Sequence, residues 1–213
     1  MQTQLDFSKE SDFSEESFLP SNSNNDAYSL VKEWPKWEGN VLFLYGPESS
    51  GKTHLANIWQ SMSDAEILSR NFSVKEIAYG KNFIIDGIED YEDEVEVFHL
   101  FNKVKDDGGY LLVTSKFSPE NLDIALPDLL SRVRAILSME IKKPDDELLI
   151  AVIMKHLSDR QLRVSKDVAL FLLSRVDRSF DKIAYLIDLL DKKSMEEGRE
   201  ITIPFTKKVL NSI

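Results

Sequence analysis

The stretch GPESSGKT, from Gly46 to Thr53, constrains the fold of this chain more than any other feature of its sequence. It fits the phosphate-binding pattern G-x-x-x-x-G-K-[ST], and it lies between a continuous apolar run (41–46) and a helical pattern (52–62). In such a loop, successive backbone N–H groups and the positive end of the following helix surround a phosphate group. The stretch therefore predicts an α/β fold that binds a nucleotide.

The side chains of this loop have separate expected roles. We expect the Lys52 ammonium to reach the β- and γ-phosphates and the Thr53 hydroxyl to bind Mg²⁺. Asp86 ends the apolar run NFIID at a predicted strand end, which suits a second Mg²⁺ partner. The expected cofactors are ADP or ATP with Mg²⁺, and the loop residues expected to surround the phosphates are Gly46, Pro47, Glu48, Ser49, Ser50, Gly51, Lys52 and Thr53.

The residue after Asp86 is Gly87, at the place where an ATPase that hydrolyses its own nucleotide usually carries a second carboxylate. Glycine supplies no base to orient an attacking water. Glu89 and Asp90 follow closely, but they lie past the strand end and would need an unusual turn to reach the γ-phosphate. We therefore expect weak intrinsic ATP hydrolysis.

Apolar runs alternate with helical patterns up to about Lys143, which predicts a doubly wound, five-stranded parallel sheet with helices on both faces. After Pro144 only helical patterns remain, which predicts a small all-helical lid. The expected strands cover residues 41–46, 65–68, 82–86, 110–115 and 135–141. The expected divisions are a flexible N-terminal tail (1–25), an α/β nucleotide-binding domain (26–143) and the helical lid (144–213).

The composition narrows the classes of function. The chain of 213 residues has no cysteine, which excludes disulfides and cysteine-liganded zinc sites. Its start lacks a secretory signal, and no apolar run approaches the roughly 20 residues that a membrane span needs, so we expect a cytoplasmic protein. The net charge is −11, with seven acids and no base from Asp86 to Glu96. Such a surface repels phosphate backbones, so tight independent DNA binding is not expected.

Several segments, in their joint order and spacing, resemble the bacterial initiator DnaA and its shorter Hda-type relatives, which belong to the AAA+ class. The segments are FLPSNSNNDAYSLV (18–31), GPESSGKTHLANIW (46–59), FIIDGIED (83–90), LLVTS (111–115), SPENLDIALPDLLSRV (118–133) and a lid segment (164–210). The resemblance implies an AAA+ P-loop NTPase fold and a role in DNA replication.

The resemblance also implies roles for individual residues. Phe18, Leu19 and Asn24 would lie on the nucleotide side of the segment that leads into the domain. Ser115 or Thr114 would sense the γ-phosphate, and Arg178 would reach the nucleotide from the lid. Arg132 would be an arginine finger presented to a neighbour's nucleotide, since a planar guanidinium supplied in trans stabilises the charge of the γ-phosphoryl transition state.

In two features the sequence departs from DnaA and resembles the Hda-type relatives instead. The sequence ends at Ile213 after the lid, where DnaA continues into a DNA-binding domain, and only 32 residues separate Thr53 from Asp86. The resemblance therefore implies a negative regulator of replication initiation, which holds ADP and stimulates ATP hydrolysis by DnaA. Gly87 agrees with a partner that does not turn over ATP itself.

The tail predicts a second partner. Gln2, Leu5 and Phe7 in QTQLDF are similar to the peptide by which proteins dock on the sliding clamp (β) of DNA polymerase III. Leu5 and Phe7 would fill an apolar cleft while Gln2 bonds its rim, although an alternative register starts at Gln4. DNA would then be contacted only through the clamp. Self-association as a homodimer through the long helical pattern (179–197) is left open by the sequence.

Two other classes of function remain open from the sequence. One is a stand-alone P-loop ATPase or kinase, which robust turnover by the isolated protein would favour. The other is a DnaA-like DNA-binding protein or replication loader, which salt-sensitive duplex binding without a clamp would favour.

Overall fold

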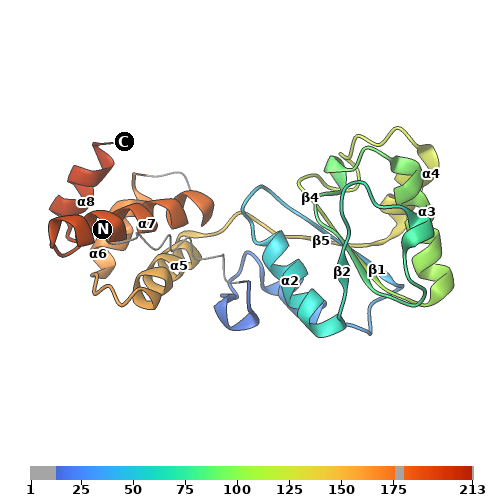
Figure 1. Cartoon of the computed structure of the whole chain (residues 1–213), viewed down its shortest axis with the longest axis horizontal. Helices are drawn as coiled ribbons and strands as arrows, with labels where there is room; N and C mark the ends of the chain where they lie inside the picture. The colour runs from blue at the N-terminus through green and yellow to red at the C-terminus, as the bar shows by residue number, and fades with distance from the viewer. Residues whose placement is uncertain (1–12, 176–179, 213) are drawn as a thin grey trace, which may run out of the picture.

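The computed structural model describes residues 13–175 and 180–212. An α/β lobe and a helical lobe lie along the long axis of the molecule and are joined by a narrow connection (Figure 1). The start of helix α2 (Lys52–Ser63) lies on the side of the α/β lobe that faces the helical lobe (Figure 1). The phosphate loop, which precedes this helix, is therefore close to the junction of the lobes.

The α/β lobe is built on five parallel strands in the order β2-β3-β4-β1-β5. The register places Phe43 of β1 beside Val113 of β4 and Ser138 of β5. This arrangement confirms the predicted five-stranded parallel sheet. The strands are β1 (Val41–Tyr45), β2 (Glu66–Ile67), β3 (Phe83–Ile85), β4 (Leu111–Ser115) and β5 (Leu137–Glu140).

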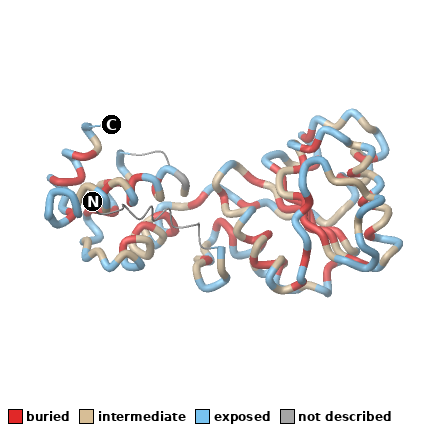
Figure 2. Tube along the Cα trace, in the orientation of Figure 1, coloured by how far each residue is buried: buried red, intermediate tan, exposed pale blue. Residues whose placement is uncertain are grey.

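The three inner strands β1, β3 and β4 are buried on both faces, as the red strands of Figure 2 show. Successive residues point to opposite faces, so Leu42 and Leu44 pack against one pair of helices, α1 and α2. Val41 and Phe43 pack on the other face, against α3 and α4. Strands that are buried in this way appear in the sequence as continuous apolar runs. The remaining helices of this lobe are α1 (Asn25–Lys32), α3 (Glu94–Asp107) and α4 (Pro127–Ala135), with short 3-10 turns η2 (Val74–Glu76) and η3 (Ile88–Asp90).

The helical lobe has a core of its own, to which all four of its helices contribute. Its first helix is capped by Asp145, whose carboxylate accepts a hydrogen bond of 2.7 Å from the backbone N–H of Leu148. These helices confirm the expected all-helical lid. They are α5 (Asp146–Asp159), α6 (Lys166–Leu173), α7 (Phe180–Glu197) and α8 (Ile203–Leu210).

The segment before α1 packs against the α/β lobe. It contains the turn η1 (Glu15–Ser17), and the buried ring of Phe18 stacks on the Tyr28 ring with centroids 5.1 Å apart. The Glu15 carboxylate accepts hydrogen bonds from Lys32 Nζ at 2.8 Å and from the Tyr28 hydroxyl at 2.7 Å. The packed lobe therefore begins before residue 26, the boundary expected from the polar sequence, because Phe18 finds a place in the core.

A side-chain hydrogen bond joins the helical lobe to the segment before α1. Lys155 Nζ on α5 donates to the Glu16 carbonyl oxygen at 2.8 Å.

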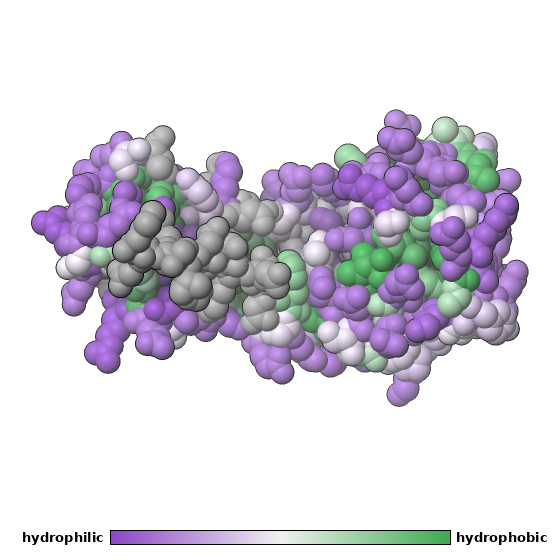
Figure 3. Space-filling model, viewed as in Figure 1, coloured by the Kyte–Doolittle hydropathy of each residue, from purple (hydrophilic) through white to green (hydrophobic). Residues whose placement is uncertain are grey.

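Within the part of the chain that the structure describes, no helix combines the length and apolar character needed to cross a lipid bilayer. The viewed surface is mostly hydrophilic, with apolar surface gathered over the α/β lobe (Figure 3).

Candidate nucleotide-binding site

The phosphate loop connects β1 to α2, as the sequence predicts. Gly51 precedes α2 with φ of 99°, in the left-handed region that favours glycine. At Gly46 a Cβ would lie 2.2 Å from the carbonyl oxygen of Ile141, so no larger residue fits without movement of the backbone. The two glycines of the motif thus serve different needs, one of conformation and one of close packing.

The Lys52 side chain folds over this loop. Its ammonium donates hydrogen bonds to the carbonyl oxygens of Gly46 and Pro47, both at 2.7 Å. Burial lowers the pKa of Lys52, and the nearby carboxylates of Glu89 and Asp86 oppose that shift. A phosphate that reaches the loop would compete with the two carbonyls for the ammonium.

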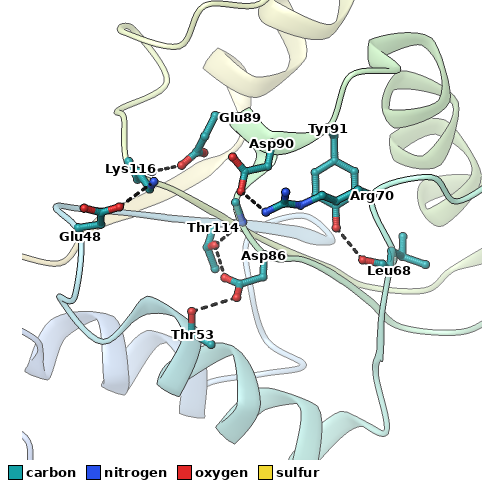
Figure 4. A network of polar contacts seen from close by, with 11 residues as sticks. Glu48, Thr53, Leu68, Arg70, Asp86, Glu89, Asp90, Tyr91, Thr114 and Lys116 are labelled. Atoms are coloured by element: carbon teal, nitrogen blue, oxygen red, sulfur yellow. Dashed lines mark hydrogen bonds and ion pairs between the residues drawn. The ribbon is translucent and has the colours of Figure 1, made fainter. Parts of the chain in front are cut away.

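Asp86 is held between two hydroxyls at the carboxyl edge of the sheet (Figure 4). The Thr53 hydroxyl donates to Asp86 Oδ2 at 2.9 Å, and the Thr114 hydroxyl donates to Asp86 Oδ1 at 2.6 Å. Thr114 in turn accepts a hydrogen bond of 2.8 Å from the backbone N–H of Gly87. The ends of β3, β4 and α2 are therefore joined through a single carboxylate.

The oxygen atoms of Thr53 and Asp86 fit Mg²⁺, which prefers oxygen ligands and is usually held by one or two carboxylates together with water and substrate phosphates. Among the described residues, no group of three or more His, Cys, Asp or Glu side chains could hold a metal by itself. The donor set thus suits an ion that arrives with a nucleotide.

The structure separates the two residues considered for the γ-phosphate sensor. Thr114 points to Asp86, whereas the Ser115 hydroxyl accepts a hydrogen bond of 3.0 Å from the backbone N–H of Phe117. Both side chains are buried, and they lie on opposite faces of β4. Thr114 is therefore the residue placed beside the expected metal site, and Ser115 supports the loop that follows the strand.

The chain makes a tight turn directly after Asp86. Gly87 has φ of 80°, and η3 follows it at once. This turn brings Glu89 back to the end of β4, where Glu89 Oε1 accepts a hydrogen bond of 3.0 Å from the backbone N–H of Lys116 (Figure 4). The carboxylate of Glu89 is thus engaged by the backbone at the end of β4. Lys116 itself pairs with Glu48 of the phosphate loop, with Nζ 2.9 Å from Oε1.

Of the three residues expected on the nucleotide side, Phe18 lies beside the start of α2, with its ring 5.1 Å from that of His54. A Cβ on Gly51 would lie 3.9 Å from the Phe18 ring, so this ring borders the phosphate loop. Asn24 is buried, accepts a hydrogen bond of 2.7 Å from Ser21 N and donates one of 3.1 Å to the Leu19 carbonyl oxygen. Asn24 thus fixes the turn that carries Phe18 and Leu19.

Arg132 lies on α4, away from the phosphate loop of its own chain. Its guanidinium stands over the Phe98 ring, with Cζ 5.3 Å from the ring centroid, and the side chain is half-buried. Within the described ranges, no ion pair to Arg132 is seen. Arg178 and the tail residues Gln2, Leu5 and Phe7 lie outside the described residues.

Two supporting residues escaped the sequence analysis. No sequence motif marks Lys116, although this residue connects the end of β4 to the phosphate loop. Glu94, at the start of α3, accepts hydrogen bonds from the backbone N–H groups of Ala125 at 2.9 Å and Leu126 at 2.6 Å. Glu94 therefore anchors the start of the helix that carries Arg132. Its partners are distant in sequence, so no local pattern could reveal this role.

Solved structures with this fold include replication proteins. Domain III of the Thermotoga maritima replication initiation protein DnaA has a TM-score of 0.79 and 23% identity, covering 95% of this chain and 97% of that chain. AMPPCP-bound DnaA from Aquifex aeolicus has a TM-score of 0.73 and 22% identity, covering 88% and 67%. The T. maritima Holliday junction motor RuvB has a TM-score of 0.74 and 18% identity, covering 93% and 71%. These likenesses show the AAA+ fold.

Sequence comparison adds the family. The family model described as "Hda, lid domain" matches residues 145–210. An uncharacterised protein of Haemophilus influenzae is 30% identical over 203 residues, covering 86% of this chain and 87% of its own. The chain belongs to the Hda-type, DnaA-homologous AAA+ family. In this Hda-type chain, the matched lid is the helical lobe described above, and the α/β lobe carries the phosphate loop.

Proposed function

We propose that this chain binds ADP or ATP with Mg²⁺ and acts in the cytoplasm as a negative regulator of replication initiation, which stimulates ATP hydrolysis by DnaA. The observation that carries the proposal is a phosphate loop with a paired Thr53 and Asp86, but with Gly87 in place of a second carboxylate. Such a site is equipped to hold a nucleotide and poorly equipped to hydrolyse it. Membership of the Hda-type family supports the regulatory role.

The nucleotide would lie on the phosphate loop, at the junction of the lobes. Backbone N–H groups of the loop would bind the phosphates of the nucleotide, and the Lys52 ammonium would bind them as well. Thr53 and Asp86 would hold Mg²⁺, which neutralises phosphate charge when it is bound. The structure of AMPPCP-bound DnaA from Aquifex aeolicus, which has this fold, supports the binding of a nucleotide.

Arg132 would act on a neighbouring molecule instead of on the nucleotide of its own chain. Its guanidinium rests on the Phe98 ring, which holds the planar group in place without neutralising it. Glu94 fixes the start of α4 and so the direction of the helix. A partly exposed cation on an anchored helix suits an arginine finger offered to the ATP of DnaA.

The tail would bring the protein to replicating DNA. Gln2, Leu5 and Phe7 would dock on the sliding clamp of DNA polymerase III, and DNA would be contacted only through the clamp. Tethering raises the local concentration of the regulator around DnaA without a new contact between them.

Lys52→Ala tests the nucleotide site. The change removes the ammonium that would bond the phosphates, and a hydrogen bond to a charged group contributes about 1.5–3 kcal/mol. ADP affinity is therefore expected to fall about 10- to 100-fold in calorimetric titration with Mg²⁺. Lys81→Ala is the matched control, because Lys81 lies before β3 at the opposite edge of the sheet. Equal affinities for both variants and the unchanged protein would contradict the site.

Deletion of residues 1–7 tests the tether. The shortened protein is expected to bind ADP normally but to lose most of its stimulation of ATP hydrolysis by purified cognate DnaA in the presence of DNA-loaded clamp. Without clamp, the full chain and the shortened chain should behave alike. Full stimulation by the shortened chain on loaded clamps would show that the tail has no part in it.

A further inference from the structure

We propose that Lys116 is a positioning residue for the phosphate loop: through its ion pair with Glu48, it keeps the loop in shape when Lys52 bonds a nucleotide. The inference rests on the proposed nucleotide site and deepens it, because it names a residue that acts on the loop instead of on the phosphates. Three observations carry it: the place of the ion pair, the backbone conformation of the loop, and the bonds that Lys52 makes.

The ion pair joins the middle of the phosphate loop to the end of β4 (Figure 4). Lys116 Nζ lies 2.9 Å from Glu48 Oε1, and the backbone N–H of Lys116 donates a hydrogen bond of 3.0 Å to Glu89 Oε1. The far end of the loop reaches the same strand through the two hydrogen bonds that Asp86 accepts. The loop is therefore tied to the end of β4 at two separate points.

The loop contains a backbone conformation that its sequence does not favour. Ser49 has φ of 54°, in the left-handed region, where the Cβ of any residue other than glycine crowds the backbone. Such a conformation persists only where the surrounding structure holds it. Glu48 directly precedes Ser49, so its ion pair with Lys116 fixes the chain next to this unfavourable angle.

Lys52 also holds this turn. Its ammonium donates hydrogen bonds to the carbonyl oxygens of Gly46 and Pro47, both at 2.7 Å. In the proposed function the same ammonium bonds the phosphates, and its three N–H donors cannot fully serve both sets of acceptors. A nucleotide would therefore loosen the bonds between Lys52 and the loop. The pair of Glu48 and Lys116 does not use this ammonium, so it would still hold the loop.

A role of Lys116 in charge alone makes a different prediction. Glu48 is exposed and carries a negative charge on a loop that is expected to bind phosphates. If Lys116 served only to neutralise that charge, removal of the Glu48 carboxylate would strengthen nucleotide binding. If Lys116 positions the loop through Glu48, removal of either side chain weakens binding. Removal of both then weakens it no further, because the same contact is lost in all three cases.

Glu48→Ala, Lys116→Ala and the double variant test the inference by titration calorimetry with Mg²⁺ and either ADP or AMPPCP, a triphosphate analogue that is not hydrolysed. Lys116→Ala keeps the backbone N–H that bonds Glu89. Because exposed ion pairs contribute little, the dissociation constants of both ligands are expected to rise only about 3-fold, and equally in all three variants. Lys208→Ala is the matched control: Lys208 pairs with Glu197 at 2.8 Å in the helical lobe, so both constants should stay unchanged.

The outcomes separate the two proposals. If the unchanged protein binds the ligands and Glu48→Ala binds them as tightly or more tightly, the positioning role is overturned while the nucleotide site stands. Losses that add up in the double variant would also overturn it, because the two side chains would then act separately. If the unchanged protein binds neither ligand, the proposed function fails and takes the inference with it.

Discussion

Arg132→Ala is expected to remove the stimulation of DnaA, lowering the stimulated rate of ATP hydrolysis by about 10³-fold or more, the scale of a missing arginine finger. The physical reason is the loss of a planar cation that the Phe98 ring and the anchored α4 helix present at the surface. Phosphate release from DnaA·ATP, measured with DNA-loaded clamp, gives the rate. Arg132→Lys is expected to recover little, because an ammonium cannot form the paired hydrogen bonds of a guanidinium.

Arg134→Ala is the matched control for this experiment. Arg134 lies on the same helix, is exposed, and its guanidinium is 3.5 Å from the Glu120 carbonyl oxygen. Its removal is expected to leave both stimulation and ADP binding unchanged. Normal stimulation by Arg132→Ala, with ADP binding intact in all variants, would show that the finger has been assigned to the wrong residue.

Trp59→Ala is expected to lower the free energy of unfolding of the α/β lobe by about 3–5 kcal/mol, the usual cost of truncating a large aromatic side chain in a core. Trp59 is fully buried on α2, stacked on Trp37 with ring centroids 5.3 Å apart and edge-on to Trp34 at 6.3 Å. Urea unfolding followed by near-ultraviolet circular dichroism measures the change.

Trp59→Phe separates volume from polarity in the same measurement. The Trp59 Nε1 atom is buried and has no hydrogen-bond acceptor among the described residues, so phenylalanine loses ring volume but no hydrogen bond. A loss well below that of Trp59→Ala is expected. Equal losses in the two variants would mean that the indole contributes through a polar contact instead of through packing.

The sequence alone predicts most of the sheet, because strands buried on both faces are made mostly of apolar residues. Val41 to Tyr45 and Leu111 to Ser115 are the clearest cases, and they are the paired central strands of the structure. The phosphate loop is equally predictable, since its glycines are required by the backbone itself. At the edge, Glu66 and Ile67 are both exposed, and the strand there is only two residues long. Its apolar pattern is correspondingly weak.

Other features depend on contacts between distant segments and could not be predicted. Thr114 and Ser115 are both hydroxyl residues at a strand end, and only the orientation of β4 shows which one meets Asp86. Residues 13–25 are polar in composition, yet Phe18 is drawn into the core by Tyr28 and His54. The position of Glu89 follows from one backbone angle at Gly87, which leaves no trace in the pattern of apolar residues.

The packing of Gly46 against Ile141 has a mechanical meaning. The backbone N–H of Ile141 bonds the Tyr45 carbonyl oxygen at 2.7 Å, and the next residue, Lys142, bonds the Ser23 carbonyl oxygen at 3.0 Å. The segment that leads from β5 to the helical lobe is thus hydrogen-bonded to the end of β1, just before the phosphate loop, and to the N-terminal segment. A ligand in the phosphate loop would therefore lie against the segment that joins the two lobes, at the point where Gly46 packs on Ile141.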